Sequence, residues 1–276
     1  MKILVTGANG YLGRGVVKCL VNDGIEVVAT DFSCNNSDCT NFKCCDLFSI
    51  DNPYEFFEKP DVLFHMAWKN GFEHGNISHI NDLPRHYAFI QKMAESGIKR
   101  IAVMGSMHEI GFYEGSINEN TPTKPESLYG VSKDALRKLT ELICRKNNVE
   151  FQWLRGFYIY SNDINGCSIF SKIAKAEAEG EKMFPFTSGE NQWDFLSYED
   201  FCIQASSAVE QNTINGIINI CNGKPEKLSY RVERFISENN YKIKLDYGKY
   251  PDRPYDSKAI WGDDRLIRQI LENKKK

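Results

Sequence analysis

The sequence lacks any apolar run close to the roughly 18 residues that a membrane-spanning helix needs. It also lacks an excess of positive charge: the net charge is −3, which gives no general attraction to nucleic acid or to an anionic membrane. A strand-like run begins at residue 2 and leaves no room for a signal peptide before it. With 42% hydrophobic and 26% charged residues and no internal repeat, the chain reads as a soluble cytoplasmic enzyme without nucleic-acid or membrane partners.

The cysteines do not form a pattern typical of disulfide-rich or zinc-binding proteins. Nine is an odd number, so a complete set of intrachain disulfides is excluded and a reducing compartment is the simpler interpretation. Cys34, Cys39, Cys44 and Cys45 cluster, but the cluster has no C-x2-C pair and no neighbouring histidine. We therefore expect no metal site, and interpret the stretch as a polar loop in which Cys45 is buried as a small apolar residue.

A glycine-rich turn is present near the start of the chain. Gly7, Gly10 and Gly13 stand in TGANGYLG, directly after the apolar run ILV. The first glycine permits a tight turn from strand to helix, the second lets the backbone approach a pyrophosphate, and the third lets helix and strand pack closely. The helix that follows would present unpaired N–H groups and its positive dipole end to the phosphates. The pattern predicts a dinucleotide-binding turn.

An acidic residue ends the second predicted strand. Asp31 follows IEVVAT and can accept hydrogen bonds from the hydroxyls of the adenosine ribose, while it would repel a 2′-phosphate. This arrangement favours NAD(H). Arg14, just beyond the third glycine, could pair with a 2′-phosphate and leaves NADP(H) as an alternative.

Strands and helices alternate over the first 160 residues. The apolar runs KILVT, IEVVAT, DVLFHMAW, KRIAVMGS and VEFQWLRGFYIY read as strands, and residues 11–24, 82–96 and 127–147 as helices. Such alternation is typical of an α/β fold with a Rossmann-type, doubly wound parallel sheet. We expect this domain to span residues 1–160 with a returning segment near 193–212, and residues 161–276 to form mainly a smaller C-terminal substrate-binding domain.

The segment YGVSK carries the predicted chemistry. Tyr129 and Lys133 are four residues apart and therefore lie on one face of a helix, one turn apart. An unperturbed tyrosine has a pKa of about 10, and a neighbouring ammonium would lower it and make the phenol a usable acid or base.

These motifs, in this order, resemble the extended short-chain dehydrogenase/reductases that act on nucleotide sugars, and the resemblance covers nearly the whole chain. It implies that Tyr11 and Leu12 complete the cofactor-binding turn and that Lys133 also holds the nicotinamide ribose. It further implies that Asp46 and Leu47, in CCDL, flank the adenine and that an arginine, Arg253 in PDRPYD, meets the substrate diphosphate. Three residues of HMAW would line the cofactor near its nicotinamide: Met66, Ala67 and Trp68.

The chain also departs from the family pattern. The usual pair of hydroxyl residues at the end of the strand KRIAVMGS appears as Ser106 and Met107, so Ser106 is the candidate for polarising a substrate carbonyl. Where dehydratases of the family carry an acid pair, this chain has His108 and Glu109, which argues against a dehydratase.

Two further departures concern the substrate. Tyr158 replaces an asparagine of the LR element and Trp193 an arginine before D-F, so substrate recognition differs from that of the family, with Tyr158 and Arg253 as predicted contacts.

A narrower resemblance is to the dTDP-4-dehydro-6-deoxyglucose reductases, carried by GSMHEIGFYEG, ENTPTKPESLYG and FPFTSGENQWDF. It implies NAD(P)H-dependent reduction of the C4 ketone of a nucleotide sugar to dTDP-fucose, for surface polysaccharides. Tyr129 would give the proton, Lys133 would tune it, and Ser106 or His108 would bind the oxyanion. A nucleotide-sugar 4-epimerase that retains NAD and a non-catalytic dinucleotide sensor remain the alternatives.

The two long predicted helices carry apolar residues on more than one face. One face would pack on the sheet, and the family resemblance implies that another forms a homodimer through a four-helix bundle. The apolar residues are Tyr87, Ile90, Leu136, Leu139 and Ile143.

Overall fold

The computed structural model describes residues 1–33, 39, 41–251 and 256–275. Its larger lobe is built on a seven-stranded sheet in the order β11-β7-β5-β4-β1-β2-β3, and every neighbouring pair is parallel. This strand order confirms the predicted Rossmann-type, doubly wound sheet. The strands are β1 (Lys2–Thr6), β2 (Glu26–Asp31), β3 (Phe42–Cys44), β4 (Val62–His65), β5 (Arg100–Ser106), β7 (Glu150–Gly156) and β11 (Gly216–Ile220).

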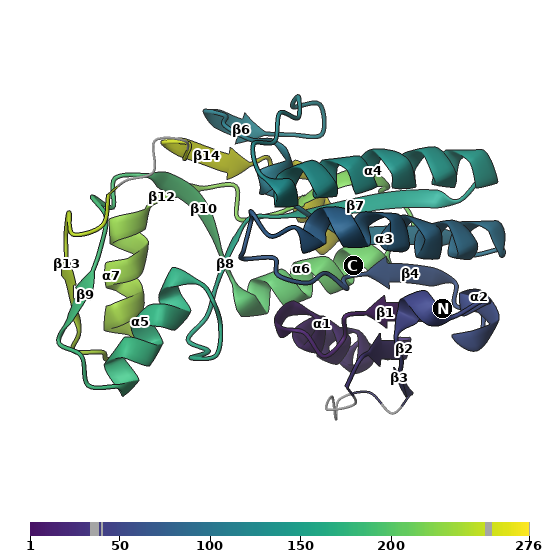
Figure 1. The fold of residues 1–276 in the computed structure, drawn as a ribbon, viewed down its shortest axis with the longest axis horizontal. Coiled ribbons are helices and arrows are strands. Elements are labelled where there is room, and N and C mark those ends of the chain that lie inside the picture. Colours follow the sequence, from purple (N-terminus) through teal and green to yellow (C-terminus); the bar gives the residue numbers. More distant parts are fainter. Residues whose placement is uncertain (34–38, 40, 252–255, 276) are drawn as a thin grey trace.

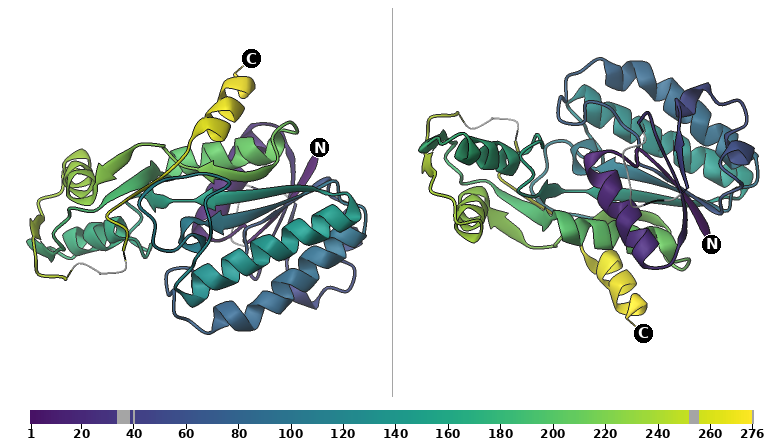
Figure 2. Two further views of the ribbon diagram at one scale, coloured as in Figure 1. Left: turned by 90° about the horizontal axis from the view of Figure 1, so that it is seen from above. Right: turned by 90° about the horizontal axis from the view of Figure 1, so that it is seen from below.

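Helices cover both faces of this sheet (Figures 1 and 2). Side chains alternate between the faces: Ile3 and Val5 of β1 join one core, while Leu4 joins the other. Because both faces are covered, β4 and β5 are buried along their whole length. One face carries α1 (Tyr11–Asn22), α6 (Tyr198–Glu210) and α8 (Arg265–Lys274), and the other carries α2 (Pro53–Phe56), α3 (Ser78–Glu95) and α4 (Leu128–Asn147).

The smaller lobe, at the left of Figure 1, has its own apolar core, with Phe170, Phe186, Phe195 and Phe235 at its centre. A second sheet has the order β12-β10-β14-β6, with β8 also paired to β10, and β13 pairs with β9. Its elements are β6 (Gly115–Ile117), β8 (Tyr158–Tyr160), α5 (Ile169–Ala178), β9 (Met183–Pro185), β10 (Gln192–Ser197), β12 (Pro225–Lys227), α7 (Leu228–Glu238), β13 (Lys244–Asp246) and β14 (Ala259–Gly262). Both lobes therefore combine segments that are distant in the sequence.

Three expected elements differ in detail. The run VEFQWLRGFYIY is two strands, because the chain leaves the large sheet after Gly156 and β8 pairs with β10 of the second sheet. The helix expected from residue 82 begins at Ser78, whose backbone N–H donates to Asn76 Oδ1. The run DVLFHMAW is a strand only as far as His65, and the next three residues lie beyond the carboxyl end of the sheet.

Of the apolar residues expected on two faces of the long helices, Ile90, Leu136 and Ile143 are at most 4% exposed and belong to the core of this chain. Tyr87 and Leu139 are half-buried. Across the described part of the chain, no helix combines the length and apolar character needed to span a membrane.

Candidate active site

The glycine-rich turn lies at the carboxyl end of β1, where the order of the strands reverses. Gly7 has a φ of +69°, and a Cβ there would lie 2.8 Å from the backbone of Ala67. A Cβ on Gly13 would lie 2.1 Å from the carbonyl oxygen of Gly7, so only glycine allows this approach of helix to strand. Gly10 begins α1 without a side-chain cap, which leaves the first-turn N–H groups of Tyr11 and Leu12 for an anion. The turn fits a dinucleotide pyrophosphate.

The side chain of Tyr11 points to the smaller lobe. Its hydroxyl donates to Ser161 Oγ at 2.6 Å, and its ring packs on Tyr198, whose hydroxyl donates to the carbonyl of Tyr11 at 2.8 Å. The predicted contact of Tyr11 with a cofactor is thus left to its backbone. Leu12 packs against the core.

Asp31 ends β2 beside this turn. One carboxylate oxygen accepts from the backbone N–H of Asn9 at 3.0 Å and the other from that of Phe32 at 2.7 Å. These bonds fix the carboxylate, and its remaining lone pairs could accept ribose hydroxyls. Arg14 is exposed on α1.

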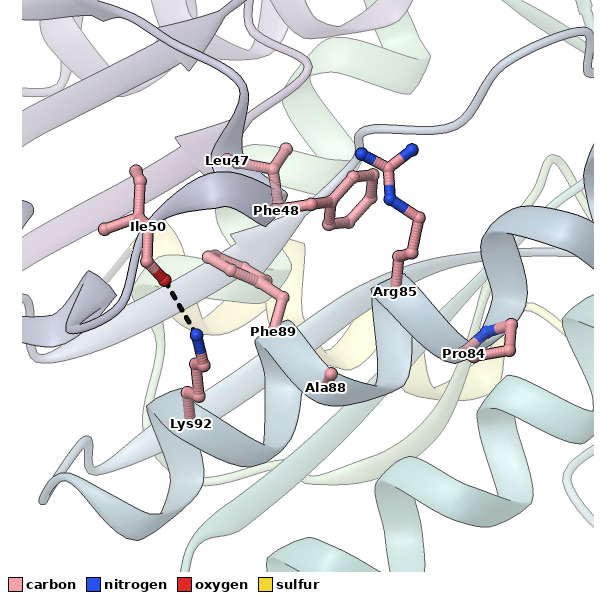
Figure 3. A pocket seen from close by; sticks show the side chains of 8 residues that line it. All are labelled: Leu47, Phe48, Ile50, Pro84, Arg85, Ala88, Phe89 and Lys92. Atoms are coloured by element: carbon pink, nitrogen blue, oxygen red, sulfur yellow. Dashed lines mark hydrogen bonds between the residues drawn. The ribbon is translucent and has the colours of Figure 1, made fainter.

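Asp46 and Leu47 stand at the start of the 3₁₀ turn η1 (Leu47–Ser49). The Asp46 carboxylate accepts from Phe48 N and forms a 3.1 Å ion pair with Arg85, while Leu47 is buried. A cavity of about 220 Å³ lies between η1 and α3 (Figure 3). Its two cations are engaged, Arg85 with Asp46 and Lys92 with the Ile50 carbonyl at 2.9 Å, so the cavity itself presents a mainly apolar wall. The cavity is lined by Leu47, Phe48, Ile50, Pro84, Arg85, Ala88, Phe89 and Lys92.

Ser106, Tyr129 and Lys133 come together where β5 meets the start of α4. The hydroxyl of Tyr129 shares a hydrogen bond with Ser106, which ends β5. Lys133 Nζ donates to the carbonyl of Met104 at 2.8 Å and lies 3.9 Å from the ring centroid of Trp68. These contacts place a proton donor, a hydroxyl and a cation within one cluster.

The pKa of Tyr129 differs from the expectation that the neighbouring ammonium of Lys133 lowers it. Burial raises the pKa of Tyr129 to about 12, although the hydrogen bond with Ser106 opposes this shift. Lys133 was expected to lower that pKa, but its ammonium is turned toward Trp68 and lies 5.9 Å from the Tyr129 ring centroid. Burial also lowers the pKa of Lys133 to about 7. Desolvation therefore dominates the pKa of both groups.

Imidazole and aromatic rings surround the phenol. His108 lies in the turn η2 (Met107–Glu109). Its ring centroid is 6.1 Å from that of Tyr129 and 6.3 Å from that of Tyr158. His74 stacks on Tyr129 with centroids 5.2 Å apart and an interplanar angle of 11°. Two of the residues that depart from the family pattern are in contact: Tyr158 stacks on Trp193, with ring centroids 4.5 Å apart.

Glu109 does not face this cluster. Its side chain is fully buried, pairs with Arg155 and accepts from the indole N–H of Trp153 at 2.8 Å. The carboxylate is committed to a structural ion pair, in line with the argument against a dehydratase acid pair.

Sequence reasoning missed the histidines around Trp68 and Tyr129. His74 follows β4 in a loop and His79 and His86 lie on α3, while His65 ends β4. All five histidines of the chain lie in this region, and four of them fall within residues 65–86. That concentration was the available signal.

Arg253 and Cys34 lie outside the described residues. Within the described ranges, no group of three or more histidine, cysteine, aspartate or glutamate residues is placed to hold a metal ion. Cys45 is half-buried rather than buried, because its thiol sits at the sheet edge 3.1 Å from Thr30 Oγ1; among the described cysteines of this cluster, Cys39 is buried. Cys44 is disulfide-bonded.

Known proteins place the chain in context. A family model described as the NAD dependent epimerase/dehydratase family matches residues 3–221. A dTDP-6-deoxy-L-talose 4-dehydrogenase (NAD(+)) of Aggregatibacter actinomycetemcomitans is 41% identical over 270 residues, covering 95% of this chain and 99% of that protein. An uncharacterized UDP-glucose epimerase of Bacillus subtilis is 26% identical over 300 residues, covering 98% and 92%.

Solved structures share the fold. A UDP-N-acetylglucosamine 4-epimerase from Methanobrevibacter ruminantium superposes with a TM-score of 0.84 at 20% identity, covering 98% of this chain and 91% of that one. A UDP-glucuronic acid 4-epimerase from Bacillus cereus, solved with UDP-glucuronic acid and NAD, gives 0.80 at 20% identity, covering 99% and 93%. With the family match, the nearly full-length relative and the glycine-rich turn, the chain belongs to the NAD-dependent epimerase/dehydratase family.

Proposed function

We propose that the chain transfers a hydride between NAD(H) and C4 of a dTDP-activated 6-deoxyhexose, and that in the cell it reduces the C4 ketone for surface polysaccharide synthesis. The observation that carries the proposal is the 41% identity to a dTDP-6-deoxy-L-talose 4-dehydrogenase over nearly the full length of both chains. The cluster of Ser106, Tyr129 and Lys133 supplies the residues that such a reaction needs.

The cofactor would lie across the carboxyl ends of β1, β2 and β4, and when bound as NADH it would supply the hydride. The first turn of α1 would hold the pyrophosphate, Asp31 a ribose, and Asp46 and Leu47 the adenine. The segment Met66 to Trp68 and the side chain of Lys133 would line the nicotinamide end. NADP(H) stays an alternative because Arg14 is exposed on the neighbouring helix.

In this reaction Tyr129 gives a proton to the ketone oxygen, and Ser106, or His108 beside it, donates a hydrogen bond to the same oxygen. The raised pKa of Tyr129 keeps the phenol protonated at neutral pH, which is the form from which a reduction starts. Oxidation starts from the phenolate, and the reaction in either direction passes between these two forms.

The sugar is the less constrained part of the proposal. The relative acts on dTDP-6-deoxy-L-talose, whereas the sequence resemblance pointed to dTDP-fucose. Both products are 6-deoxyhexoses with a hydroxyl at C4, and they differ in ring stereochemistry. We propose that Tyr158, stacked on Trp193, and Arg253 contact the dTDP-sugar.

A 4-epimerase is the second candidate, favoured by the UDP-glucose epimerase relative that covers 98% of the chain. It would retain NAD through each cycle and consume no net NADH. A non-catalytic sensor is disfavoured because Ser106, Tyr129 and Lys133 form one connected cluster.

We also propose a homodimer through α3 and α4, which expose Ile80, Val131 and Leu142. A mass of one subunit by light scattering at micromolar concentration would contradict this assembly. The cytoplasmic location stays a prediction.

The test is to mix the purified protein with NADH or NADPH and follow the absorbance of the reduced nicotinamide. The C4 ketones of dTDP-6-deoxy-L-talose and of dTDP-fucose are offered separately. Stoichiometric loss of absorbance with one ketone, and a C4 hydroxyl in the product by NMR, is expected. Conversion of dTDP-6-deoxy-L-talose or dTDP-fucose itself, offered with NAD in place of the ketone and NADH, to its C4 epimer without net formation of NADH would favour the epimerase.

A further inference from the structure

The indole of Trp68 is the nearest aromatic surface to the catalytic ammonium. Lys133 Nζ lies 3.9 Å from its ring centroid, within the range of a cation–π contact. The Lys133 side chain is only 3% exposed, so this contact forms away from water, where such contacts are strongest. A second N–H of the ammonium donates to the Met104 carbonyl at 2.8 Å. An ammonium has three donors, and among the contacts of the described residues the third is left for a ligand.

The indole is itself fixed by two histidines. His86 stacks on it, with centroids 4.6 Å apart and planes at 17°, and His79 lies nearly parallel to it, with centroids 5.9 Å apart and planes at 15°. Its N–H donates to His79 Nδ1 at 3.0 Å. The indole cannot swing away from the ammonium without breaking both the stacking on His86 and the hydrogen bond to His79.

Hydrogen bonding determines the protonation of both flanking imidazoles. His79 Nδ1 accepts from the indole, so its proton is on Nε2, which donates to the Glu73 carbonyl at 3.1 Å. Both histidines next to the indole can then be neutral, which avoids repulsion of the Lys133 ammonium.

A chain of hydrogen bonds gives the same result for His86. Thr6 Oγ1 accepts from the N–H groups of Met66 and Ala67, each at 3.2 Å, and therefore donates its own proton to His65 Nδ1 at 2.8 Å. His65 Nε2–H then donates to His86 Nδ1 at 2.8 Å. The chain is satisfied only with neutral imidazoles.

We infer that Trp68 is a positioning residue for Lys133: its π face, fixed by the stacking of His86 and the hydrogen bond to His79, holds the ammonium in the orientation that leaves one N–H for the nicotinamide ribose. The inference rests on the proposed role of Lys133 in holding the cofactor and not on which sugar is reduced. The groups that face Lys133 are Trp68, Tyr129 and the Met104 carbonyl, with His65, His86 and the paired carboxylate of Glu109 further off.

The test compares Trp68→Phe, which keeps a π face, with Trp68→Leu, which fills the space without one. NADH affinity is measured by fluorescence titration from pH 6 to pH 9, together with the melting temperature. Trp68→Leu should weaken NADH binding on the order of tenfold near pH 7, as expected for the loss of a desolvated cation–π contact, and Trp68→Phe should change it by less than about threefold. The pH above which binding weakens should also fall in Trp68→Leu, because the charged form of Lys133 loses its partner.

Leu83→Ala provides the control, since Leu83 packs against the same apolar core as Trp68. It should lower the melting temperature and leave the pH dependence of NADH binding unchanged. His79→Leu removes the acceptor of the indole N–H and should shift binding in the same direction as Trp68→Leu, which keeps the test informative if Trp68→Leu does not fold.

NADH affinity and pH dependence like those of the wild type in Trp68→Leu, or in a folded His79→Leu when Trp68→Leu is unfolded, would overturn the inference. Because the readout is cofactor binding, failure to reduce any dTDP-sugar would overturn the proposed reaction without changing this result.

Discussion

Burial sets the acid–base properties of single side chains in this site. The pKa of Tyr129 is raised to about 12 and that of Lys133 is lowered to about 7, in both cases mainly because the charged form is poorly solvated. Tyr129 thus stays a phenol at neutral pH, while a change in local contacts can decide the charge of Lys133.

Replacing Tyr129 with phenylalanine tests the role of the phenol directly. The variant should lose roughly 10²-fold or more of its rate of ketone reduction, because general acid catalysis typically contributes 10²–10⁴-fold. Its NADH affinity should remain within about twofold of the wild type, since the ring and its stacking on His74 are kept. Steady-state kinetics and fluorescence titration measure the two quantities, and an active Tyr129→Phe enzyme would remove the phenol from the mechanism.

At the scale of helices and strands, a hydrogen bond joins the two lobes next to the cofactor turn. Tyr11, at the first position of α1, donates to Ser161 just after β8, while Tyr198, at the start of the neighbouring helix α6, donates to the Tyr11 carbonyl. The start of the phosphate-binding helix is therefore tied to the lobe that would hold the sugar.

Tyr11→Phe removes one hydroxyl from this connection and keeps the ring. We expect the free energy of unfolding to fall by about 0.5–1.5 kcal/mol, the usual net contribution of one hydrogen bond. Ser161→Ala removes the same bond and also the acceptor of the Asp163 N–H at 3.3 Å, so it should cost more, and the double variant should cost little more than Ser161→Ala alone. Urea unfolding measures all three, and strictly additive losses would show that the two hydroxyls are energetically independent.

The alternation of strands and helices and the place of the glycine-rich turn followed from hydrophobic period and glycine spacing, because both are local properties of the sequence. The break of the run VEFQWLRGFYIY at Phe157 was not predicted, since the residues on either side are equally apolar and only the pairing with β10 separates β8 from β7. The position of Ser106 beside Tyr129 was predicted. The direction of the Lys133 side chain was not, because it depends on Trp68, which stands 65 residues earlier and is held by histidines on another helix.

For the molecule as a whole, the buried histidines link stability to pH. Burial lowers the pKa of His65 to about 3 and also strongly lowers that of His86, whereas a histidine in the unfolded chain has a pKa of about 6.5. Below about pH 6.5 the unfolded state therefore binds protons that the folded state excludes. The free energy of unfolding is therefore undiminished above the unfolded pKa of about 6.5 and falls as the pH drops below it.

Urea unfolding at pH 7.5, 6.5 and 5.5 tests this linkage. The free energy of unfolding should fall below pH 6.5 with a limiting slope of about 1.4 kcal/mol per pH unit for each such histidine. Carboxylates whose pKa is lowered, such as Asp61 and Asp263, contribute only at lower pH. Equal stability at pH 6.5 and 5.5 would contradict the buried, neutral state of His65 and His86.

The most direct test of the proposed reaction is to follow the hydride itself. The protein is incubated with NADH that carries deuterium at the transferable C4 position and with the C4 ketone of a dTDP-6-deoxyhexose, and the product sugar is examined by NMR and mass spectrometry. The proposed function predicts one deuterium, bonded to C4 of the sugar, for each NADH oxidised. Unchanged ketone and NADH that keeps its deuterium, with protein shown to bind NADH, would contradict it.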